Sequence, residues 1–111
     1  MTTDKAQVLY GDVKAGLLLR TVDGFEFAYD PSYLQRADAL PISHALPLRP
    51  EPYQSSALFP FFDGLLPEGW LLGLTTTTLK IDANDRWGLL LVTGADTVGA
   101  VTVRPIEEMN K

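Results

Sequence analysis

Few side chains in this sequence combine the type and the spacing that enzyme chemistry requires. His44 is the only histidine and cysteine is absent, which excludes multi-histidine and thiolate metal sites and a thiol nucleophile. Ser43 precedes His44 on a segment predicted to be extended, where adjacent side chains point to opposite faces. The two residues therefore cannot form a nucleophile–base pair, and we interpret His44 as a surface or satisfied polar histidine.

Carboxylates and glycines offer two weaker candidates. Asp82 and Asp85 lie close together near a predicted helix start, where helix capping is a better interpretation than acid–base catalysis. Residues 94–99 superficially resemble a phosphate-binding loop, but no Lys-Ser/Thr pair follows and a strand is predicted next, so they are interpreted as a turn. The sequence therefore predicts no catalytic residue, no cofactor site and no metal site, and hence no enzyme.

The two tryptophans are the strongest candidates for a binding role. Trp87 precedes the apolar residues 88–91 and is predicted to pack in the core. Trp70 follows Gly69 at a predicted helix start, where few other side chains can cover it. Tryptophan is enriched at binding hot spots because it buries a large area at a small entropic cost. From the residues alone, Trp70 could pack in the core or contact a partner.

Length, composition and charge predict a single globular domain over residues 1–111. The chain is 46% hydrophobic and 21% charged, and a chain of this size buries roughly two-thirds of its unfolded surface, enough for one core. The net charge of −5 and the scattered basic residues oppose direct binding to nucleic acid. The sequence contains neither an apolar run that could span a membrane nor a signal peptide, so we expect a cytoplasmic protein that contacts no membrane.

Alternating apolar residues and turn signals predict an antiparallel sheet at the start of the chain. Phe25, Phe27 and Tyr29 are predicted on one face of this sheet and Glu26 on the other. The predicted strands cover residues 6–10, 13–21, 25–29 and, returning to the same sheet, 99–104. Residues 41–52 contain four prolines and are predicted to be a loop with one edge strand around residues 42–46.

Capping residues and prolines predict three or four short helices. Asp30 is predicted to cap a helical turn that runs to Arg36. Ser55 and Ser56 are predicted to cap a helix that ends near Leu66. The buried face of that helix is predicted to consist of Leu58, Phe61, Phe62 and Leu65.

Two further helices are predicted, over residues 67–79 and after a cap within residues 82–84. The second of them carries Trp87, Leu90 and Leu91. Together the elements predict an α+β fold, a small antiparallel sheet with three or four short helices packed against it.

Five short pieces of the sequence, in order, resemble the HipA N-terminal subdomain family. Residues 61–69 resemble its Phe-Phe-x-Asn-Leu-Leu-Pro-Glu-Gly signature, and residues 94–103 resemble its Gly-x-Asp-Ser-Val-Gly-Ala-Val ending. The other pieces are residues 16–18, 25–30 and 46–48. Gly64 departs from the family's Asn, and residues 70–74 are apolar where members carry arginine and other polar residues.

The resemblance implies a binding protein. HipA-type toxins continue into a kinase core, whereas this chain ends at Lys111 without a phosphate-gripping loop, a catalytic Asp-Asn pair or a metal-binding Asp motif. The sequence is most similar to small stand-alone antitoxins of three-component (HipBST) type II toxin–antitoxin systems, which act in bacterial persistence. The implied function is to bind and neutralise HipT, a HipA-like serine/threonine kinase toxin that lacks this subdomain, in a larger complex with a DNA-binding HipB-like protein. The alternative is a non-catalytic N-terminal subdomain of a HipA-type kinase, with a structural or regulatory role.

The apolar helix start after the signature is the predicted partner-binding surface, because an exposed apolar surface is commonly covered by another protein. Trp70 is its expected hot spot. The predicted partner-binding residues are Leu66, Pro67, Glu68, Gly69, Trp70, Leu71 and Leu74.

Overall fold

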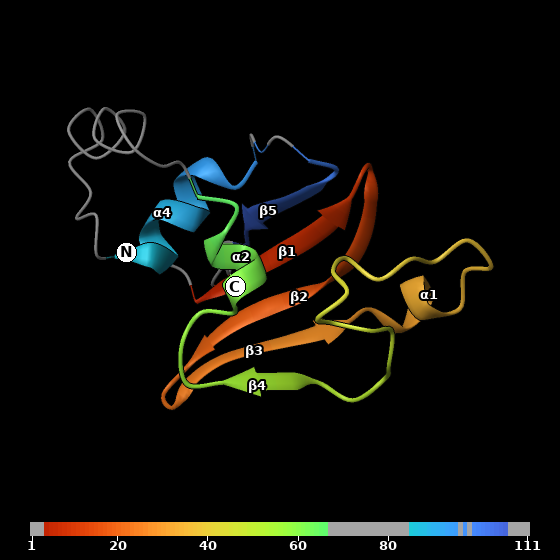
Figure 1. Ribbon diagram of the computed structural model, residues 1–111, viewed down its shortest axis with the longest axis horizontal. Helices are drawn as coiled ribbons and strands as arrows, with labels where there is room; N and C mark the ends of the chain where they lie inside the picture. The colour runs from red at the N-terminus through yellow and green to blue at the C-terminus, as the bar shows by residue number, and fades with distance from the viewer. Residues whose placement is uncertain (1–3, 67–84, 96, 98, 107–111) are drawn as a thin grey trace, which may run out of the picture.

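The computed structural model describes residues 4–66, 85–95, 97 and 99–106, and a five-stranded antiparallel sheet lies at its centre (Figure 1). The strand order is β4-β3-β2-β1-β5. The strands are β1 (Lys5–Tyr10), β2 (Val13–Thr21), β3 (Gly24–Tyr29), β4 (Tyr53–Ser55) and β5 (Val101–Pro105). The helices are α1 (Pro31–Leu34), α2 (Pro60–Asp63) and α4 (Arg86–Thr93). The predicted α+β fold is confirmed.

The opening β-meander and the returning strand follow the predicted pattern. Gly11, at φ +62°, lies in the turn between β1 and β2, a conformation that favours glycine. β5 pairs with β1, with Val103 opposite Val8, so the end of the chain closes one edge of the sheet. These pairings place strands from both ends of the described chain side by side.

The core lies on one face of the sheet. Alternating residues in the middle of the central strands are fully buried there, among them Val8, Leu18 and Phe27, because successive side chains of a strand point to opposite faces. The helices complete this core with buried residues such as Phe62 and Leu90. Phe27 packs at 5.6 Å from the ring of Phe62, which fixes α2 on the sheet.

The prediction for β3 and for the helical turn after it is confirmed. Phe27 and Tyr29 are buried and Phe25 packs against the same core, while Glu26 lies on the opposite face. Asp30 caps α1 by accepting a 2.9 Å hydrogen bond from the amide of Ser32, as predicted. The helix ends at Leu34, two residues earlier than expected.

The prediction for residues 42–46 was wrong. They form no strand, only an isolated bridge between Ser43 and Leu46. The hydroxyl group of Tyr29 donates to the carbonyl of Leu46 and accepts from the amide of Ile42 at 3.0 Å. These backbone groups are therefore bonded to a side chain instead of a strand.

The prediction of a helix capped by Ser55 and Ser56 was also wrong. Ser55 belongs to the edge strand β4 and pairs with Phe25, and its hydroxyl oxygen accepts a 3.3 Å hydrogen bond from the amide of Ala57. The helix begins only at Pro60, after Phe59. Of its predicted buried face, Phe62 is fully buried, whereas Leu58, Phe61 and Leu65 are partly buried against the core.

The last predicted helix exists but begins later than expected. Its N-cap is Asp85, not a residue of 82–84, because the Asp85 carboxylate accepts a 3.0 Å hydrogen bond from the amide of Gly88. Trp87 and Leu90 are buried in the core, and Leu91 packs against it. The helix predicted over residues 67–79 lies outside the described residues.

Candidate functional site

The predicted partner-binding residues lie almost entirely outside the described part of the chain. Leu66 is described and is buried in the core, with 4% of its surface exposed. The other members of the predicted surface fall within residues 67–84: Pro67, Glu68, Gly69, Trp70, Leu71 and Leu74. Their role in partner binding stays a prediction. The structure describes the residues on both sides of this segment, up to Leu66 and from Asp85 onwards.

The residues that precede the segment are held by consecutive backbone hydrogen bonds. The amide of Asp63 donates to the carbonyl of Phe59 at 3.0 Å, and the amide of Leu66 donates to the carbonyl of Asp63 at 3.2 Å. Leu66 then inserts its side chain into the core. The backbone is therefore fixed up to the residue before Pro67.

The two ends of the segment are joined by an ion pair, which we call the Asp63–Arg86 clamp. The Nε atom of Arg86, the first residue of α4, donates to the Oδ1 atom of Asp63, the last residue of α2, at 2.7 Å. The two side chains are 35% and 44% exposed, so solvent screens the pair only in part. In the sequence, residues 67–84 thus lie between two helices that are linked to each other.

Trp87 anchors the returning end, and the prediction that it packs in the core is confirmed. Its side chain is 3% exposed and its ring lies 5.8 Å from that of Phe25. The guanidinium of Arg20 lies over the indole, 5.7 Å from the ring centre, a cation–π contact. Arg20 also pairs with Asp4 at 2.7 Å, so α4 is tied to both β2 and the start of β1.

Gly64, the position at which the family signature carries Asn, has no need of glycine. Its backbone lies in the right-handed helical region, at φ −69° and ψ −12°. A Cβ atom there would lie 3.3 Å from the carbonyl oxygen of Pro60, a tight but tolerable contact. The residue is exposed, so the departure from Asn changes the surface beside the clamp rather than the fold.

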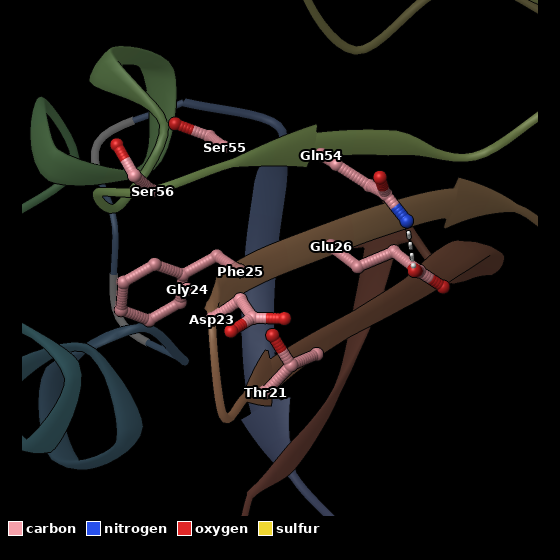
Figure 2. Close-up of a pocket in the computed structure, with 8 residues that line it drawn as sticks. All are labelled: Thr21, Asp23, Gly24, Phe25, Glu26, Gln54, Ser55 and Ser56. Atoms are coloured by element: carbon pink, nitrogen blue, oxygen red, sulfur yellow. Dashed lines mark hydrogen bonds between the residues drawn. The ribbon is translucent and has the colours of Figure 1, made fainter.

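An open hollow lies between the β2–β3 turn and β4 (Figure 2). It measures about 430 Å³, and the side chain of Gln54 crosses it to donate a 3.1 Å hydrogen bond to Glu26. The residues that line it are Thr21, Asp23, Gly24, Phe25, Glu26, Gln54, Ser55 and Ser56. The sequence offered no signal for this hollow, because β4 was not predicted.

The hollow has no arrangement suited to catalysis within the described residues. Ser55 and Ser56 have no histidine beside them, and the hydroxyl oxygen of Ser55 accepts a hydrogen bond from Ala57. Across the described part of the chain, no group of three or more histidine, cysteine, aspartate or glutamate side chains could hold a metal ion. The hollow is therefore a polar surface depression.

The remaining candidate residues that the structure describes are exposed or have a structural role. His44 is exposed, which confirms the surface interpretation. Asp85 caps α4, as expected for one member of the predicted carboxylate pair, and Asp82 lies outside the described residues. Burial raises the pKa of the Tyr29 hydroxyl to about 12, so this buried phenol stays protonated and holds the loop of residues 42–46 to the sheet.

Comparisons with known proteins agree on one family. The model of the HipA N-terminal domain matches residues 6–104. An uncharacterized protein of Haemophilus influenzae is 38% identical over 96 residues, which cover 86% of each chain. The putative kinase Y4mE of Sinorhizobium fredii is 35% identical over 82 residues, covering 74% of this chain but only 20% of that protein.

A solved structure with the same architecture is the N-terminal domain of a HipA toxin. It superimposes with a TM-score of 0.73 and 32% sequence identity, over 95% of this chain and 94% of that one. In the part of the present chain that the structure describes, no helix combines the length and the apolar character needed to cross a membrane.

Proposed function

The chain belongs to the HipA N-terminal domain family, and on this premise we propose that it is an antitoxin that neutralises a HipA-like kinase toxin. In this proposal the partner is HipT, a serine/threonine kinase that lacks this domain, and the chain corresponds to HipS of the three-component HipBST systems. The complex also contains a DNA-binding HipB-like protein and is located in the cytoplasm. The chain itself contributes no catalysis.

The observation that carries the proposal is that the domain makes up very different shares of two relatives. In Y4mE the match spans a fifth of a putative kinase. In the Haemophilus influenzae relative the same domain accounts for 86% of the protein. A domain that is covalently part of a kinase in one relative and stands nearly alone in another is suited to bind a kinase in trans.

The geometry beside the predicted surface supports a binding role. Leu66 in the core and the Asp63–Arg86 clamp fix both ends of the segment that carries Trp70. A binding segment whose ends are already fixed loses less conformational freedom on association, which favours affinity. A large aromatic residue on such a segment is the type of side chain that forms hot spots.

The alternative, a non-catalytic subdomain that acts within its own kinase polypeptide, is favoured by the match to Y4mE. The two functions differ in whether the domain acts in trans. An antitoxin restores growth when it is expressed as a separate chain beside the kinase. A structural subdomain affects the kinase only when it is fused to it.

The test is coexpression in bacteria of this protein with a HipA-like kinase that lacks its own N-terminal domain. We expect growth to be restored and the two proteins to copurify as a stable complex. A control uses an inactive kinase, which should still copurify. Failure of the separate chain to bind or rescue, with rescue by the fused form, would establish the alternative instead.

A further inference from the structure

We draw no further inference here: the strongest candidate, the face of the sheet opposite the core around Leu17 and Leu19, carries Lys14 and Glu26 that already have partners within the chain, Asp30 and Gln54, and nothing in the structure shows what covers it.

Discussion

The carboxylate of Asp63 lies 2.7 Å from the guanidinium of Arg86, although 23 positions of sequence separate the two residues. Asp63 ends α2 and Arg86 begins α4, so the ion pair links two helices that pack on the core through Phe62 and Trp87. The ion pair therefore connects the packing of the domain with the residues on both sides of its predicted partner-binding segment.

The clamp should contribute modestly to the stability of the fold. We expect a double-mutant cycle with Asp63→Asn and Arg86→Gln to give a coupling free energy of about 0.5–1 kcal/mol in urea unfolding, since both side chains are partly exposed. The cycle is needed because each single substitution also removes other contacts. The more exposed pair of Arg36 and Asp38 is the matched control and should show a smaller coupling. Equal coupling free energies in the two pairs would show that the Asp63–Arg86 pair contributes no more than an ordinary surface ion pair.

Substitution by alanine should be costly at one glycine, Gly16, and nearly neutral at another, Gly64. A Cβ atom at Gly16 would lie 2.4 Å from the carbonyl oxygen of Ala28 and 2.8 Å from the ring of Phe27, so Gly16→Ala should cost about 1–3 kcal/mol of unfolding free energy. Gly64 has a helical backbone and looser contacts, so Gly64→Ala should change the stability by less than about 0.5 kcal/mol. Thermal melting of both variants tests the pair. Similar melting temperatures would show that the packing of Phe27 on Gly16 is misplaced.

Most strands could be predicted from the sequence because their signals are local. The two-residue period of Phe25, Phe27 and Tyr29 and the turns at Gly11 and Gly24 depend only on neighbouring residues. The cap at Asp30 is equally local. β4 escaped prediction because its three residues carry no period, and they form a strand only through pairing with β3, a partner distant in sequence.

The candidate site was predictable only in part for the same reason. The spacing around residues 61–70 identified the family, and the apolar run after Trp87 placed that residue correctly in the core. The Asp63–Arg86 clamp and the closure of the β5 edge by Gly94 arise from contacts between distant segments. No periodicity or spacing in the sequence encodes either contact.

The buried hydroxyl of Tyr29 should make the fold sensitive to alkaline pH. Its pKa is raised to about 12 in the folded protein against 10.0 for an exposed tyrosine, chiefly by burial. The stabilisation is therefore fully present below pH 10 and is lost as the pH rises from about 10 towards 12, because the unfolded chain loses this proton first. Unfolding free energies measured across this range should fall by about 2 kcal/mol more in the wild type than in Tyr29→Phe.

Tyr29→Phe also tests the neutral form of the same contact. Removal of the hydroxyl leaves the amide of Ile42 and the carbonyl of Leu46 without their partner, which should cost about 1–3 kcal/mol at neutral pH. Tyr10→Phe, at a partly buried position in β1, is the control and should lack this cost at neutral pH. A Tyr29→Phe variant as stable as the wild type would contradict the bridging role.

The isolated protein should bind no nucleotide, because none of the motifs that hold ATP and magnesium in kinases occurs in its sequence. Titration calorimetry with Mg-ATP should give only the heat of dilution. The kinase partner, titrated under the same conditions, provides the positive control. Saturable binding in the micromolar range by this protein alone would contradict the non-catalytic function.

Substitutions of the two tryptophans should have different effects, Trp87→Ala on folding and Trp70→Ala on binding. Trp87 is buried against Phe25, so Trp87→Ala should lower the unfolding free energy by about 3–5 kcal/mol. If Trp70 enters a pocket of the kinase, Trp70→Ala should leave the melting curve nearly unchanged and weaken the complex by about 2–4 kcal/mol, or roughly 30- to 1000-fold. Growth rescue by coexpression should then fail for a well-folded Trp70→Ala protein, whereas Val22→Ala, at a fully exposed position, should rescue like the wild type. A collapsed melting curve would place Trp70 in the core, and full rescue by a folded variant would place the hot spot elsewhere.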